Sequence, residues 1–231
     1  MSLALRLEQV LRGRLGTYTT FKKIQETVWF VNHVGEVVVV RSVGGHPREE
    51  NERDLLKRFQ DQTSNIRPLI DEIEDPTELD TIVLRHLDDH LPQASIEMTL
   101  NGKEIKYVLK AVLKTLSGLN EDSYIYTDTF VNHGDGEDDI RFSDIQRGDF
   151  GDAYSQDSKW AKSGTPIDSP IWNNPEVLID LPYNTTTDIW SFGTLIYGAN
   201  FNIFRRKEAR YDDEIYPFEV ELFEDQRFLG D

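Results

Sequence analysis

The sequence predicts an α+β fold, in which a β-rich N-terminal part precedes a mainly helical part. Residues 18–43 are rich in β-branched side chains and are interrupted at Gly35, which is typical of antiparallel hairpins. Residues 185–197 carry large apolar side chains around most of the circumference of a helix, which is typical of a buried helix. With 231 residues, of which 38% are hydrophobic, the chain is long enough to bury such a helix.

The first 84 residues are expected to contain an amphipathic helix followed by strands. Spacing typical of one face of a helix packed on the domain occurs at Leu3, Leu7, Val10 and Leu11. Strands are expected where apolar and β-branched side chains are frequent, at residues 21–24, 28–31, 37–40, 66–73 and 81–84.

Between the third and fourth of these strands, a helix is expected from about residue 46 to residue 60. Pro47 suits its first positions. Glu52 precedes Leu55 and Leu56 by three and four residues, so all three side chains project from one face. A carboxylate on the buried face of a helix requires a cation. Arg41, at the end of the preceding strand, is the candidate partner of Glu52.

Two further helices are expected after residue 100. Residues 105–119 place their leucines and valines on one broad face, which is the pattern of an amphipathic helix. At the start of residues 185–197, hydroxyl groups suit an N-terminal cap, and Asp188 suits the positive end of the helix dipole.

Composition limits the classes of partner and of compartment. The formal net charge of −17 opposes binding to nucleic acid or to anionic membranes, because both favour basic surfaces. No apolar run has the length of a transmembrane helix. The chain has no cysteine, which excludes disulfides and thiolate metal sites and agrees with an intracellular, cytoplasmic or nuclear location.

Residues 85–91 form a polar link after the last expected strand. His86 and His90 are four residues apart and lie beside Asp88 and Asp89, so a metal site is one interpretation. A polar link without metal is favoured, because no other candidate ligands support such a site.

Three short motifs follow one another in the second half of the chain. They are Asp149-Phe150-Gly151, Asn174-Pro175-Glu176 and Asp188-Ile-Trp-Ser-Phe-Gly193. In this order they resemble the Asp-Phe-Gly, Ala-Pro-Glu and Asp-x-Trp-Ser-x-Gly motifs of the protein-kinase superfamily, and the chain most resembles kinase-like proteins of fungi. The resemblance implies one two-lobed domain over residues 1–231. Residues 1–87 would be the small lobe with its N-terminal helix, and residues 88–231 a large lobe truncated at its C-terminal end.

The resemblance also implies roles for individual residues. Arg41 stands where the family has the lysine that pairs with ATP phosphates, and Glu52 stands where it has the glutamate that pairs with this lysine. Asp149 is implied to bind Mg²⁺, and Asp128 corresponds to the catalytic base. Adenine is implied to meet the backbone of the hinge between the lobes, at Arg85, His86 and Leu87.

Several positions depart from the family pattern. The turn expected to cover the phosphates, residues 25–27, lacks glycine, and Glu26 places a negative charge near an anion. Arg41 is not equivalent to lysine, because its charged group is a longer planar fork. Beside Asp128, the family's histidine is replaced by Tyr126, and its lysine and metal-binding asparagine are absent.

We therefore expect a pseudokinase, which is a kinase-fold interaction or regulatory module that binds ATP and Mg²⁺ weakly or not at all. Asp128 would then be a vestigial base. A residual Ser/Thr protein kinase that transfers the γ-phosphate of ATP to protein hydroxyl groups is the first alternative. A decayed or mis-spliced gene product is the second. The interpretation without enzymatic activity is favoured, because several groups that position phosphate and metal are changed together.

The short large lobe leads to an expectation about partners. Four large side chains of the buried helix need apolar cover on all sides, namely Trp190, Phe192, Leu195 and Ile196. Only residues 214–223 offer one further apolar helix to supply it. We expect a protein partner or self-association at the surface left uncovered.

Overall fold

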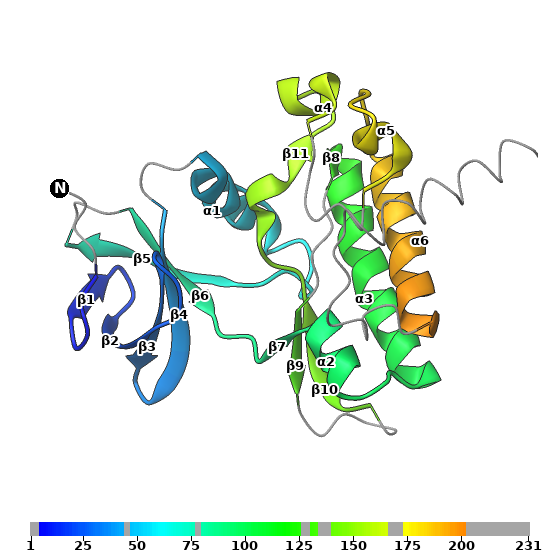
Figure 1. The fold of residues 1–231 in the computed structure, drawn as a ribbon. Coiled ribbons are helices and arrows are strands. Elements are labelled where there is room, and N and C mark those ends of the chain that lie inside the picture. Colours follow the sequence, from blue (N-terminus) through cyan, green and yellow to red (C-terminus); the bar gives the residue numbers. More distant parts are fainter. Residues whose placement is uncertain are drawn as a thin grey trace, which may run out of the picture.

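The computed structural model describes residues 5–43, 47–76, 80–125, 130–133, 140–165 and 173–201. Figure 1 shows the strands of the N-terminal part on the left and the helices of the C-terminal part on the right. The α+β architecture predicted from the sequence is confirmed. Among the described residues, no helix combines the length and the apolar character that a membrane span requires.

The N-terminal part is a closed barrel of antiparallel strands in the order β1-β2-β3-β4-β6-β5. Its strands are β1 (Val10–Gly13), β2 (Thr17–Lys23), β3 (Val28–His33), β4 (Glu36–Ser42), β5 (Leu69–Asp75) and β6 (Thr81–Arg85). Arg41 in β4 lies opposite Val28 in β3 and Ile82 in β6. Hydrogen-bonded strands on both sides therefore fix the position of Arg41.

The helix predicted near the N-terminus is wrong for the described residues. Residues 5–9 form no helix, and the following residues form strand β1, in which Leu11 is buried while Val10 is exposed. This strand pairs with β2 on one side and with β5 on the other. It thus satisfies backbone groups of two strands that would otherwise be sheet edges. Its partner in β5 is distant in the sequence, so the local spacing of leucines could not reveal the pairing.

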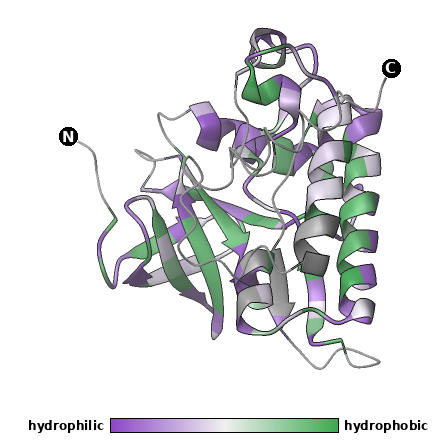
Figure 2. Cartoon of the chain, turned by 45° about the vertical axis from the view of Figure 1, so that its right-hand side comes forward, coloured by the Kyte–Doolittle hydropathy of each residue, from purple (hydrophilic) through white to green (hydrophobic). Residues whose placement is uncertain are grey.

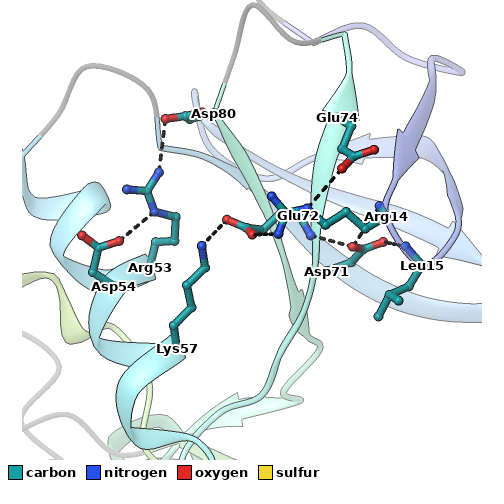
Figure 3. Close-up of polar contacts among 9 residues, drawn as sticks. All are labelled: Arg14, Leu15, Arg53, Asp54, Lys57, Asp71, Glu72, Glu74 and Asp80. Carbon is teal, nitrogen blue, oxygen red and sulfur yellow. Dashed lines mark hydrogen bonds and ion pairs between the residues drawn. The ribbon is translucent and has the colours of Figure 1, made fainter.

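A buried carboxylate holds the turn between β1 and β2 against β5. Asp71 accepts hydrogen bonds from the backbone nitrogens of Arg14 (3.1 Å) and Leu15 (2.8 Å), as Figure 3 shows. It also accepts one from the hydroxyl group of Tyr18 (2.9 Å), and burial together with this contact raises the pKa of Tyr18. Gly13 is required here, because a Cβ at this position would overlap the Asp71 carboxylate.

The C-terminal part is built around the helix α3 (Gly102–Glu121), whose start carries a capping box between Asn101 and Glu104. Around it lie β7 (Asp89–His90), α2 (Leu91–Glu97), β8 (Tyr124–Ile125), β9 (Phe130–His133), β10 (Phe142–Gln146), the 3₁₀ helix η1 (Phe150–Asp152), β11 (Tyr154–Ser155), α4 (Lys159–Ser163), α5 (Pro175–Leu178) and α6 (Thr186–Phe201).

Two hydrophobic clusters position the candidate site. The first joins the barrel to the helix α1 (Pro47–Phe59) and to η1, and includes Leu55, Leu56, Phe59, Leu84 and Phe150. The second packs α3 against α2 and β10, and Phe192 and Leu195 of α6 lie against it. Figure 2 shows the corresponding hydrophobic stretches along the barrel strands and along the long helices.

The prediction that α6 is buried on all sides is wrong for the described residues. Its face toward α3 is buried, including Asp188 and Ser191, whereas Ile189 is 60% exposed and Trp190 is 37% exposed. The Asn120 amide of α3 donates to Asp188 Oδ2 (2.8 Å) when its nitrogen faces that carboxylate. The helix is therefore covered on one side, and the described elements leave its opposite side in solvent. The Ile196 side chain and residues 214–223 lie outside the described residues.

Candidate functional site

The helix α1 carries an acidic residue on its buried face, as the sequence predicted. Glu49 and Glu50 lie in its first turn, where they complement the helix dipole. Its buried side chains are Glu52, Leu55, Leu56 and Phe59. The apolar members anchor the helix in the first hydrophobic cluster, so Glu52 is carried into the interior beside the end of β4.

Arg41 and Glu52 form a hydrogen-bonded ion pair, which confirms the predicted contact. The Glu52 side chain is fully buried, while the Arg41 side chain is 22% exposed. Burial alone would lower the pKa of Arg41, but the carboxylates of Glu52 and Asp149 raise it. Burial raises the pKa of Glu52, and the charge of Arg41 opposes this shift. The pair joins the barrel to α1 at the point where the resemblance places the ATP phosphates.

Asp149 completes a charged cluster at this point. Its Oδ1 lies 3.3 Å from Nη1 of Arg41, and its Oδ2 lies 3.4 Å from Nη2 of Arg48, in the first turn of α1. The same Arg48 nitrogen lies 2.9 Å from Oδ2 of Asp152. Asp149 has left-handed backbone dihedrals, with φ 61° and ψ 50°. Each carboxylate oxygen of Asp149 therefore faces a guanidinium group.

Asn51 fastens the segment that follows Asp149 to α1. Its Nδ2 donates to the carbonyl oxygens of Gly151 (3.0 Å) and Ala153 (2.9 Å), with a longer contact to that of Phe150 (3.4 Å). The Phe150 side chain is buried in the first hydrophobic cluster. A Cβ at Gly151 would overlap the Arg48 side chain, which explains glycine at this position.

The opposite side of α1 is held by ion pairs to the barrel, which Figure 3 shows. Lys57 Nζ lies 2.6 Å from Glu72 in β5, and Arg53 lies 3.2 Å from Asp80 just before β6. Glu72 also pairs with Arg14 in the turn between β1 and β2 (2.8 Å). Polar contacts therefore hold α1 from two sides.

The turn between β2 and β3 is tight, and backbone N–H groups within it donate hydrogen bonds to the turn itself. The nitrogens of Ile24 (2.9 Å) and Gln25 (3.1 Å) both donate to the carbonyl oxygen of Val28, and Glu26 is exposed. Thr27 Oγ1 lies 3.4 Å from Glu49 of α1. Two backbone amides that could contact a phosphate therefore already have a partner inside the turn.

The hinge residues are also engaged within the protein. The Arg85 carbonyl oxygen accepts from Nε of Arg67 (2.8 Å), and the Arg85 side chain pairs with Asp144 (3.0 Å). The His86 ring packs edge-on against Phe30 of β3, with ring centroids 5.0 Å apart. Burial lowers the pKa of His86 and outweighs Asp88, whose carboxylate is 3.6 Å away. Leu87 is half-buried.

The structure separates the candidate residues into groups. It brings Arg41, Glu52 and Asp149 together, and it places Arg85, His86 and Leu87 at the end of β6. Asp128 lies outside the described residues. Within the described part of the chain, no three His, Cys, Asp or Glu side chains form a group that could hold a metal ion. The alternative of a metal site around His86 and His90 therefore finds no support there.

Sequence reasoning did not identify Arg48, Asn51 or Arg67. A signal existed for Arg48, because it precedes Glu52 by four residues and so shares its helical face. Asn51 and Arg67 carried no such signal, because the carbonyl groups that they contact lie far away in the sequence or belong to irregular backbone.

Comparisons with known proteins find similarity in fold and in part of the sequence. The fold is similar to a chain of the yeast RNA Pol II CTD kinase CTDK-1 complex, with a TM-score of 0.68 and 16% identity over 84% of this chain and 64% of that chain. The sequence is 32% identical over 101 residues to serine/threonine-protein kinase PAK 5 of Rattus norvegicus. It is 36% identical over 95 residues to serine/threonine-protein kinase cst-1 of Caenorhabditis briggsae. No protein-family model matches the chain.

These matches are partial. The match to PAK 5 covers 42% of this chain and 13% of that protein, and the match to cst-1 covers 41% of this chain and 18% of that protein. They show that part of the sequence is similar to serine/threonine-protein kinases and that the fold is similar to that of a kinase.

The resemblance to protein kinases implies a metal ion at Asp149, and the described residues do not fit one. A divalent cation takes carboxylate and water oxygens that are free to face it. Both oxygens of Asp149 face guanidinium groups, at 3.3 and 3.4 Å. A metal ion bound there would lie beside two positive charges and would have to displace at least one of them.

Proposed function

We propose that this chain is a pseudokinase, a kinase-fold interaction or regulatory module that binds ATP weakly or not at all. The observation that carries the proposal is the turn between β2 and β3. The backbone nitrogens of Ile24 and Gln25 are both hydrogen-bonded to Val28, which lies opposite Arg41 in the sheet. Glu26 adds a negative charge to the same turn. A phosphate near Arg41 would therefore find an acidic turn in place of free amide donors.

The hinge supports the same conclusion. The Arg85 carbonyl oxygen, one of the groups expected to meet an adenine, already accepts a hydrogen bond from Arg67. The His86 ring of the hinge also packs against Phe30 of the barrel strand β3. A nucleotide base would compete with both contacts.

A thermal-shift titration with ATP tests the proposal, with and without Mg²⁺ or Mn²⁺. We expect a rise in melting temperature of less than about 1 °C at about 1 mM ATP, because ligand below its dissociation constant stabilises little. The variant Arg41→Ala is the matched control, since it removes the cation of the site. A rise that requires metal and is lost in Arg41→Ala would contradict the proposal.

A residual Ser/Thr protein kinase is the second candidate function. The observation in its favour is that Arg41, Glu52 and Asp149 are assembled as one ion-paired group. In this interpretation Arg41 would contact phosphates, Asp149 would bind Mg²⁺ and Asp128 would act as base. The similarity to serine/threonine-protein kinases is compatible with it.

We further propose that the exposed face of α6 binds a protein partner or a second copy of the chain. The exposure of Ile189 and Trp190 supports this binding role. The structural neighbour belongs to a protein complex, which is compatible with a partner-binding role. We also propose that the protein acts inside the cell, and the absence of cysteine supports this location.

A further inference from the structure

We propose that Arg48 acts as a built-in cation at Asp149 and keeps divalent metal ions from this carboxylate. The inference rests on the proposed function in one respect, namely that no metal-dependent nucleotide chemistry occurs at Asp149. It adds the residue responsible and a way to reverse its effect.

The geometry places one nitrogen of Arg48 where a metal ion would bridge two acids. Nη2 lies 3.4 Å from Oδ2 of Asp149 and 2.9 Å from Oδ2 of Asp152. Arg41 faces the other oxygen of Asp149 at 3.3 Å. Because a single atom of Arg48 contacts both carboxylates, its charge occupies the space between them.

The charges of the cluster show why Arg48 decides its affinity for cations. Two arginines, Arg41 and Arg48, face three carboxylates, those of Glu52, Asp149 and Asp152. Without Arg48, Arg41 would remain in contact with Glu52 and Oδ1 of Asp149, and the charge of Arg67 would still act on Glu52. In contrast, Oδ2 of Asp149 and Oδ2 of Asp152 would lose the cation between them, and an added cation would take its place. Magnesium and manganese ions are commonly bound through one or two carboxylates and water.

The backbone and packing explain why Arg48 reaches this position. It lies in the first turn of α1, directly after Pro47, and four residues before Glu52. Gly151 leaves room for its aliphatic part, because a Cβ there would overlap Arg48. Asn51 holds the backbone after Asp149 close to the same turn of the helix. The Arg48 side chain is itself 44% exposed, so its replacement removes a charge and little buried surface.

The test measures the melting temperature of the full chain in increasing Mn²⁺, without nucleotide. For the wild type we expect no shift that depends on Mn²⁺. For Arg48→Gln we expect a rise of about 2–4 °C at about five times a dissociation constant of roughly 1 mM, which is in the range of weak carboxylate sites. Arg48→Lys, which keeps the charge, should behave as the wild type does.

Two controls separate a local site from a general charge effect. Arg53→Gln removes a positive charge from the same helix, but Arg53 pairs with Asp54 and Asp80, away from Asp149. This variant should show no shift with Mn²⁺. The double variant Arg48→Gln/Asp149→Asn should lose the shift gained by Arg48→Gln. If Arg48→Gln folds poorly, Arg48→Met supplies a second neutral variant that keeps an apolar contact over Gly151.

The inference is overturned if Mn²⁺ stabilises the neutral variants no more than it stabilises the wild type. This result leaves the pseudokinase proposal standing, because that proposal is tested by ATP. Conversely, a rise with ATP that requires metal and is lost in Arg41→Ala, together with no shift in Mn²⁺ alone, would contradict the pseudokinase proposal and leave the role of Arg48 in the absence of nucleotide intact.

Discussion

The helices α1 and α6 each bury an acidic side chain, but they differ in how completely they are held. Glu52 of α1 and Asp188 of α6 are both fully buried. Polar contacts hold α1 on two sides, through Asn51 and Arg48 to the segment after Asp149 and through Lys57 to β5. In contrast, α6 is packed on α3 and exposes Ile189 on the other side.

A buried acidic side chain therefore does not by itself determine what a helix does. The contacts of α1 fix a charged site in one arrangement, which suits a structural or regulatory role. The open face of α6 is an apolar surface suited to association.

Glu52→Ala is expected to have the largest effect on stability. It leaves Arg41 without its buried partner, and because Arg41 keeps some access to water, the free energy of unfolding should fall by about 1–3 kcal/mol. Denaturant unfolding measures the change. Glu50→Ala, in the exposed first turn of the same helix, is the control and should stay within about 0.5 kcal/mol of the wild type. Equal effects of the two substitutions would show that the ion pair contributes nothing.

Asn51→Ala should have the next largest effect. It removes donors from the carbonyl groups of Gly151 and Ala153, and the expected loss is about 1–2 kcal/mol. Amide hydrogen exchange provides a second readout, since exchange in residues 150–155 should accelerate more than exchange in the barrel. Uniform acceleration across the chain would indicate that Asn51 does not specifically hold this segment.

Lys57→Met should have a smaller effect, because the ion pair with Glu72 is partly exposed to water. The Lys57 side chain is 43% exposed, so the free energy of unfolding should fall by less than about 1 kcal/mol, and the decrease should be smaller at high salt. Unfolding at low and high salt concentration tests this expectation. A loss larger than that of Asn51→Ala would reverse the ranking of the two sides of α1.

At α6, substitution should change association more than stability. Ile189→Ser replaces a side chain that is mostly in solvent, so the free energy of unfolding of the monomer should change by no more than about 0.5 kcal/mol. If this surface mediates self-association, light scattering should show a dimer of the wild type at high concentration and a monomer of the variant. A wild type that stays monomeric at all concentrations, with a melting temperature independent of concentration, would exclude self-association through α6.

The sequence predicted those parts of the molecule that depend on local spacing. The pairing of Arg41 with Glu52 followed from the three- and four-residue spacing of Glu52 to two leucines and from the strand just before the helix. The helix α3 followed from its apolar face. These features could be predicted because the residues that decide them are close together in the chain.

Features that depend on distant contacts could not be predicted in this way. Strand β1 is defined by its pairing with β5, and Asn51 by carbonyl groups about a hundred residues further along the chain. The one-sided burial of α6 depends on which elements cover it, whereas its sequence shows only that it is apolar. Arg48 combined a local signal, its spacing to Glu52, with a distant partner, Asp149.

The central claim, that the kinase fold here serves a role other than phosphoryl transfer, is tested most directly by a transfer assay. Wild type and Asp128→Asn would be incubated with labelled ATP, Mg²⁺ or Mn²⁺, and generic Ser/Thr substrates. Because the loss of one transition-state donor costs a factor of about 10²–10³ and several are changed here, we predict equal, background labelling for both proteins. Incorporation by the wild type that is abolished in Asp128→Asn would contradict the claim and establish a residual kinase.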